Sequence, residues 1–135
     1  MKISKNFSLE EFTKSAAAES LKINNTPSME SVVNLCALVH NVLQPLRDVV
    51  GKPIRINSGY RSEGVNKAIG GAAHSQHMRG QAADIRVMDV TPTVLGEMIK
   101  NLYPFDQLII YPTFVHVSYS IYGNRGERIF KRGRK

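Results

Sequence analysis

Ser75-Gln-His-Met-Arg-Gly-Gln-Ala-Ala-Asp84 places an imidazole, His77, and a carboxylate, Asp84, seven residues apart. Gly80 lies between them and gives the backbone the freedom to turn both side chains toward one point. A second imidazole, His116, follows in an alternating run that predicts a β-strand. Two histidines and one aspartate suit a catalytic Zn²⁺ ion whose fourth position stays open for water. We therefore predict a zinc site made by His77, Asp84 and His116, and a hydrolase that uses it.

The length and composition predict a single domain over residues 1–135. Of the 135 residues, 42% are hydrophobic, which is enough for a core without help from disulfides or oligomerisation. Cys36 is the single cysteine and lies among apolar neighbours, so we expect it in the core. We expect the domain to be a monomer.

The N-terminus has no apolar segment followed by a cleavage site, and no apolar run approaches the roughly 18–20 residues that cross a bilayer. We therefore expect synthesis in the cytoplasm without a signal peptide, and no membrane insertion. Action outside the cell would then need release by another route.

The formal net charge is +7, and basic residues concentrate in a tail over about residues 123–135. Such a tail suits any polyanion, whether nucleic acid, anionic lipid or an acidic wall polymer, and it also fits a solvated chain end. A nucleic-acid binder would interleave aromatic residues with the basic ones, and the tail offers Phe130 alone as a platform of this kind. Nucleic acid is therefore an unfavoured partner.

Local patterns predict helices early in the chain and strands later. Ser8 followed by Glu11 has the form of a capping box, and a longer helix after Ser28 carries apolar residues at three- and four-residue spacing. Pro45 predicts a kink in that helix and Gly51 its end. The expected helices are residues 8–15, 28–50 and 91–102, the expected strands are 53–57, 83–88, 107–111, 115–119 and 128–131, and no element is predicted for 59–72. Because β-α-β alternation is missing, this order predicts the α+β class, with an antiparallel sheet and flanking N-terminal helices.

Arg61 follows the first predicted strand and is a candidate for binding substrate. A guanidinium pairs with a carboxylate through two hydrogen bonds, so Arg61 would anchor a substrate carboxylate; the alternative is a structural ion pair.

His74 precedes His77 by three residues, a spacing that brings two ligands together mainly on a helix, whereas Gly70-Gly71 indicates a loop. We therefore expect His74 at the rim of the site.

Several short segments taken together carry a resemblance to a known family. They are Ser58-Gly-Tyr-Arg-Ser62, Asn66, Gly70-Gly71, the segment Ser75–Asp84, Phe105-Asp-Gln-Leu108 and Val115-His-Val117. From Phe7 to Tyr119 the chain resembles the zinc D-alanyl-D-alanine carboxypeptidases of peptidase family M15, above all its compact phage- and prophage-type members. The resemblance implies the hedgehog/DD-peptidase fold, a zinc ion on His77, Asp84 and His116, and cleavage of peptidoglycan stem peptides. It also implies that Arg61 binds a substrate carboxylate, with Ser75 and Gln107 as further candidates for substrate binding.

One feature departs from the family. Its members usually carry a glutamate a few residues before the last histidine ligand, acting as general base, and none lies between Gln107 and Val115 here. Tyr111 is then the first candidate for the polar group nearest the attacking water, although a phenol is a poor base and better suited to donate to a developing oxyanion. Asp106 and Glu97 are the alternative bases.

The pairing of the last two long strands decides which of these side chains lie near the metal. A hairpin with a two- or four-residue loop pairs Ile109 with His116. Directly opposed residues share a face of the sheet. Gln107, Tyr111 and Ser118 would then lie on the metal side with His116, and Asp106 would point away unless a bulge resets the register.

Three functions compete. The first is a zinc peptidase of the bacterial cell wall that removes a terminal D-alanine or cuts within the stem peptide. The second is a wall-binding or structural module that keeps the zinc site with weak or no catalysis, because general acid–base assistance contributes about 10²–10⁴ in rate. The third, a nucleic-acid binder, is disfavoured by the composition of the tail.

Overall fold

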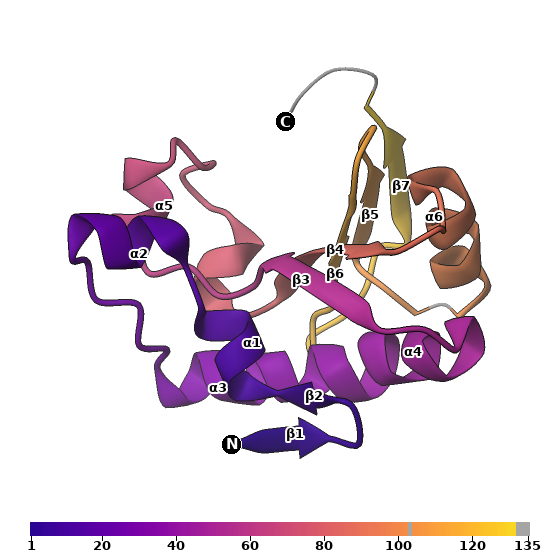
Figure 1. Ribbon diagram of the computed structural model, residues 1–135, viewed down its shortest axis with the longest axis horizontal. Helices are drawn as coiled ribbons and strands as arrows, with labels where there is room; N and C mark the ends of the chain where they lie inside the picture. The colour runs from indigo at the N-terminus through magenta and orange to yellow at the C-terminus, as the bar shows by residue number, and fades with distance from the viewer. Residues whose placement is uncertain (103, 132–135) are drawn as a thin grey trace.

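Helices from the first part of the chain pack against a five-stranded sheet built by later residues (Figure 1). The computed structural model describes residues 1–102 and 104–131. The helices are α1 (Leu9–Thr13), α2 (Ala16–Leu21), α3 (Met29–Leu38), the π-helical turn η1 (Val39–Leu43), α4 (Gln44–Val50), α5 (Glu63–Ala68), the 3-10 turn η2 (Gln76–Arg79) and α6 (Pro92–Asn101). The strands are β1 (Lys2–Ser4), β2 (Phe7–Ser8), β3 (Ile54–Ser58), β4 (Ala82–Val87), β5 (Gln107–Ile110), β6 (Val115–Ser118) and β7 (Glu127–Phe130). The predicted α+β class is confirmed.

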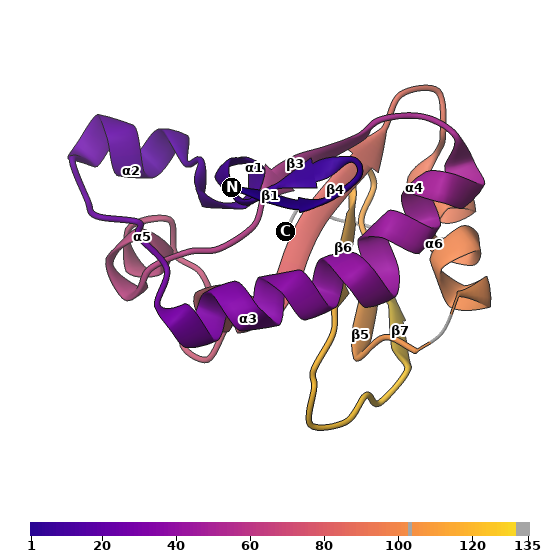
Figure 2. The ribbon, with the colours of Figure 1, turned by 90° about the horizontal axis from the view of Figure 1, so that it is seen from below.

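The long helix expected over residues 28–50 is present as one continuous rod made of α3, η1 and α4 (Figure 2). The side chain of Ser28 accepts a hydrogen bond from the Ser31 amide at its start, and Gly51 ends it in the left-handed conformation (φ +67°). The irregularity predicted at Pro45 takes the form of the π-helical turn just before it. Proline has no amide hydrogen to donate, so the helix widens there instead of breaking.

The large sheet has the strand order β3-β4-β6-β5-β7. In the β5–β6 hairpin Ile110 pairs with Val115 and Ile109 with His116, which confirms the predicted register. Across the next ladder Asp84 of β4 lies directly opposite His116 of β6. Directly opposed residues share a face, so three neighbouring strands place Asp84, His116 and Ile109 in one row.

The strand predicted at residues 128–131 exists as β7 at the edge of the sheet, and it adds a parallel pairing to the predicted antiparallel sheet. β7 runs parallel to β5, and the other ladders are antiparallel. β6 ends beside the start of β5, and the chain then crosses that start to its other side, where the Gly126 amide donates to the Phe105 carbonyl and the Glu127 amide to the Asp106 carbonyl. β7 therefore begins beside the start of β5 and runs in the same direction.

The two faces of the sheet have different roles. On one face apolar residues of β4, β5 and β6 pack with the long helix and α6 into the main hydrophobic core. The large buried members of this core are Phe12, Leu35, Leu38, Leu43, Leu46, Ile85, Leu95, Ile99 and Leu108. Strand alternation turns Asp84 and His116 to the opposite face. The core therefore holds rigid the strands that carry the polar residues.

Several short elements were not predicted from local patterns. β1 and β2 form a separate two-stranded sheet, and Ser15 caps α2 by accepting a hydrogen bond from the Ala18 amide. Within the segment 59–72 the helix α5 begins at its cap Ser62.

Cys36 is partly exposed rather than fully in the core. Within the described part of the chain, no helix combines the length and apolarity needed to cross a membrane. Residues 132–135 of the basic tail lie outside the described residues.

Candidate metal centre

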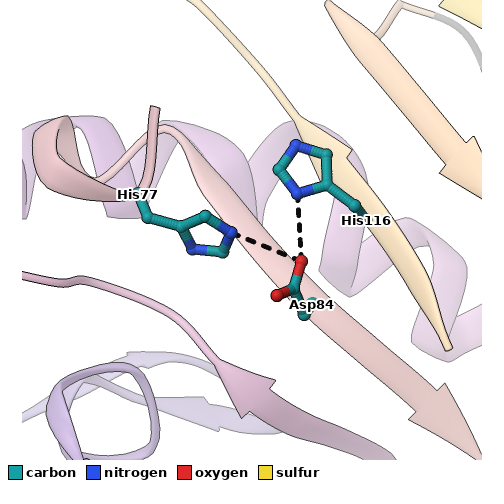
Figure 3. Close-up of side chains that lie close together, drawn as sticks. All are labelled: His77, Asp84 and His116. Atoms are coloured by element: carbon teal, nitrogen blue, oxygen red, sulfur yellow. Dashed lines mark hydrogen bonds and ion pairs between the residues drawn. The ribbon is translucent and has the colours of Figure 1, made fainter. Parts of the chain in front are cut away.

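The structure brings His77, Asp84 and His116 together from three elements: η2, β4 and β6 (Figure 3). Both imidazoles turn toward one carboxylate oxygen. His77 Nε2 lies 3.3 Å and His116 Nδ1 lies 3.0 Å from Asp84 Oδ1, and all three ligand atoms lie within 4.8 Å of one another. All three side chains are buried. Ligands about 2.1 Å from a tetrahedral zinc ion are about 3.4 Å apart, so these atoms need only small shifts to share one ion.

The hydrogen bonding of His77 determines which of its nitrogens faces the ion. Its Nδ1 lies 2.7 Å from the carbonyl oxygen of Gly59, which can only accept, so the ring proton is on Nδ1. Nε2 then presents a lone pair; it is buried and has no hydrogen-bond partner within the described residues. Burial also lowers the pKa of His77, which favours the neutral ring. A buried lone pair aimed at two other ligands fits a metal ion well.

Gly59 is held in place by close packing. A Cβ at this position would meet the backbone of Phe12 at 2.6–2.7 Å, and the Tyr60 amide donates to the Phe12 carbonyl at 2.7 Å. The carbonyl that orients His77 is therefore fixed against α1. In this way the capped N-terminal helix contributes to the metal centre without supplying a ligand.

Asp84 is ionised despite its burial. Burial acts to raise its pKa, but the hydrogen bond from His116, together with the nearby imidazole of His77, outweighs it and holds the pKa well below the usual range of an aspartate. Its second oxygen, Oδ2, lies 3.4 Å from Nη2 of Arg61. The carboxylate is thus shared between a guanidinium on one oxygen and the two imidazoles on the other.

Arg61 is 5% exposed, and its guanidinium is engaged on all three nitrogens. Nη2 faces Asp84, Nε donates to Ser58 Oγ at 3.0 Å, and Nη1 donates to Asn66 Oδ1 at 3.2 Å. The structural ion pair considered for Arg61 is present, and its role in binding substrate stays a prediction. A Cβ on Gly71 would clash with the Asn66 amide oxygen, so the glycine lets the loop close over this network.

A cavity of about 720 Å³ opens beside the metal centre. It is lined by Arg61, Ile69, Gly70, Gly71, Ala72, His74, Ser75, Gln76, His77, Arg79, Asp106, Gln107, Ile109, Tyr111, His116 and Arg125. The candidates Ser75, Gln107 and Tyr111 therefore border the same space as the two histidine ligands. His74 is an exposed residue of this lining, as expected for the rim.

The expectation that Asp106 points away is wrong, because Asp106 lines the cavity. It precedes β5, so the alternation of the strand does not govern its direction. Its carboxylate accepts from Nε and Nη2 of Arg125 at 3.0 and 2.9 Å and from Nε2 of Gln76 at 3.0 Å. The hydrogen bond from Arg125 is the main cause that lowers the pKa of Asp106. Sequence reasoning missed Arg125 and Gln76 as its partners.

Tyr111 and Glu97, the other two candidates, have opposite environments. Tyr111 is 8% exposed, its ring stacks on Phe114 with centroids 4.5 Å apart, and burial raises the pKa of its phenol. Glu97 is exposed on α6, with Lys100 3.8 Å away. α6 covers the other face of the sheet, where a Cβ on Gly96 would meet Ile110, so Glu97 is remote from the metal centre.

Comparisons with known proteins agree with this geometry. The sequence profile of the family described as Peptidase M15 matches residues 5–118. A curated protein of Streptomyces albus G, named zinc D-Ala-D-Ala carboxypeptidase, is 50% identical over 60 residues. That match covers 44% of this chain and 24% of the relative, so the chain spans well under two thirds of the length of that protein.

Proposed function

Because this chain belongs to the peptidase M15 family, we propose that it is a zinc-dependent peptidase that hydrolyses the stem peptides of peptidoglycan. The observation that carries the proposal is the convergence of His77 Nε2, Asp84 Oδ1 and His116 Nδ1 in the wall of a cavity large enough for a peptide. The name of the Streptomyces albus G relative supports a peptide ending in D-alanine as the type of substrate.

The three ligands would hold the ion, and the surrounding residues would fix them. When bound, zinc supplies a Lewis acid that polarises a peptide carbonyl and lowers the pKa of water. The Gly59 carbonyl keeps His77 in the tautomer that ligates, and Arg61 holds Asp84 by its second oxygen. The phenol of Tyr111 stays protonated at neutral pH and would donate a hydrogen bond to the substrate oxygen that gains negative charge.

The described residues of this site offer no free carboxylate to act as general base. Among the described residues that line the cavity, Asp106 is the single carboxylate, and Arg125 and Gln76 already occupy it. This observation favours a second candidate function: a zinc-bearing module that binds the wall peptide and turns it over slowly or not at all. The rate lost without a base is about 10²–10⁴.

A second cavity adjoins the metal cavity, which bears on the bond that is cut. The second, of about 630 Å³, is lined by Asp84 and Phe114 and shares Arg61 and Ile69 with the first. A peptide that occupied both cavities would have residues on both sides of the scissile bond. This arrangement supports cleavage within a stem peptide over removal of a terminal residue.

Loading the purified protein with zinc and incubating it with muropeptides tests the proposal. We expect one zinc ion per chain and peptide products whose masses mark an internal cut, both lost in His77→Ala. Release of terminal D-alanine alone would overturn the internal cut, and stoichiometric zinc without any product would favour the binding module.

Tyr111→Glu separates the two functions further. A carboxylate at this buried position next to the metal centre would supply the missing base, so we expect turnover to rise by at least about tenfold. Tyr111→Gln controls for the lost phenol, because it fills a similar space without a base. Equal turnover in both variants would show that a carboxylate here does not act as the base.

A further inference from the structure

Arg79 and Arg125 border the metal cavity where it adjoins another. The neighbouring cavity, of about 470 Å³, shares Gln76, Arg79, Asp106 and Arg125 with the metal cavity. Its lining, as far as the chain is described, includes none of the three metal ligands. The two arginines therefore mark a part of the cavity that is separate from the metal centre but continuous with it.

Among the described residues that line the cavity, one positively charged side chain has no anionic partner. Three arginines and one carboxylate line it, counting Arg61, Arg79, Arg125 and Asp106, and the ion would add further positive charge. Arg61 is occupied by Asp84, and Arg125 by Asp106. The guanidinium of Arg79 donates from Nε to Gln81 Oε1 at 3.2 Å, and within the described residues its two terminal nitrogens make no hydrogen bond or ion pair.

The backbone of Arg79 is held in position, and its exposed side chain is attached to Gln81 through Nε. Its carbonyl accepts a hydrogen bond from Asn34 Nδ2 at 2.9 Å, and Gly80 follows it in the left-handed conformation (φ +73°), against the backbone of Ser31. Gln81 is 7% exposed. A guanidinium whose Nε side is fixed presents its two terminal N–H groups with little loss of freedom when a ligand binds.

We propose that Arg79 binds a free carboxylate of the substrate and so selects stem peptides that are not amidated at that group. The proposal rests on the proposed function, since it names the substrate class of the same cavity. Two parallel N–H donors match the two oxygens of a carboxylate. A carboxamide offers one oxygen and an NH₂ donor, which the guanidinium cannot accept. Arg61 cannot replace Arg79 in this role because Asp84, Ser58 and Asn66 occupy it.

Two synthetic stem peptides that differ only in carboxylate against carboxamide test the proposal. We expect the zinc-loaded protein to prefer the carboxylate in kcat/KM by about 10- to 100-fold, and Arg79→Gln to bring that ratio close to one. Arg55→Gln is the matched control, because it removes the same charge from an exposed arginine of β3 outside the metal cavity. The control should keep the wild-type ratio.

A wild-type ratio near one, or an unchanged ratio in Arg79→Gln, would overturn the carboxylate subsite. If the wild-type protein cleaves neither peptide, the proposed function fails, and the subsite is then decided by titration calorimetry with both peptides. Tighter binding of the carboxylate that Arg79→Gln abolishes supports the subsite, and equal affinities refute it. Zinc content measured in each variant shows whether a change comes from the metal centre instead.

Discussion

Asp84 and Asp106 are two aspartates of similar burial, 4% and 5% exposed, with different partners. Asp84 faces two imidazoles with one oxygen and Arg61 with the other. Asp106 faces the guanidinium of Arg125 with both oxygens and receives the Gln76 amide as well. In both cases the hydrogen bonds hold the pKa of the aspartate below its usual value.

The two aspartates differ in whether their partners offer only hydrogen-bond donors or also a lone pair. Guanidinium and amide N–H groups only donate, so Asp106 is complete as an ion pair. An imidazole with its proton turned away brings a lone pair, as His77 Nε2 does beside Asp84. A buried carboxylate that faces such a lone pair is repelled by it unless a cation lies between them. The cluster around Asp106 is therefore structural, and the cluster around Asp84 is the candidate metal centre.

Asp84→Asn should have the largest effect, because it removes the one negative ligand while keeping the shape. We expect the dissociation constant for zinc to rise by at least about 100-fold. At a zinc concentration 1,000 times the wild-type dissociation constant, the roughly 4 kcal/mol of stabilisation that binding gives should largely disappear. Thermal unfolding with and without zinc measures both. An unchanged zinc-induced shift would remove Asp84 from the ligand set.

Asp106→Asn should weaken the fold and leave zinc binding in place. Arg125 loses its ionised partner but is largely exposed, so we expect the free energy of unfolding to fall by about 1–3 kcal/mol. Urea unfolding of the metal-free protein measures the loss, and a competition titration measures zinc affinity. A collapse of zinc affinity comparable to that of Asp84→Asn would contradict the assignment of Asp106 as structural.

The stability difference between wild type and Asp106→Asn should also depend on pH. The folded pKa of Asp106 is depressed, so its stabilisation is fully present above the unfolded pKa of about 4 and is lost as pH falls through the folded value. We expect the full difference above roughly pH 5 and a shrinking one below pH 4. Asp84 is the same in both proteins, so its titration cancels in this difference. A difference that stays constant down to pH 2 would exclude an ionised Asp106 as its source.

Glu97→Gln should have the smallest effect. The side chain is exposed, pairs weakly with Lys100 and lies on the face of the sheet away from the metal. We expect activity within about twofold of wild type and stability within about 0.5 kcal/mol. A loss of turnover at unchanged zinc content would reinstate Glu97 as a candidate base.

Local patterns were sufficient where a residue acts on its own neighbourhood. Ser28, Thr91 and Gly51 mark helix ends at which the side chain or the backbone conformation is fixed within a few residues. The hairpin register, and with it the position of Ile109 opposite His116, followed from the shortness of the connecting loop. The short helices α2 and α5 were missed because two turns of helix carry too few residues to show a period.

The sequence by itself predicted the three candidate metal ligands, the α+β class and the pairing of the last hairpin, because spacing, alternation and capping are local properties. Only the tertiary structure decided that Arg61 forms an ion pair with Asp84, that Asp106 forms one with Arg125, and that β7 is parallel to β5. Each of these depends on groups distant in sequence competing for the same partner. The outcome depends on burial and on distances between side chains, and local sequence patterns do not give either quantity.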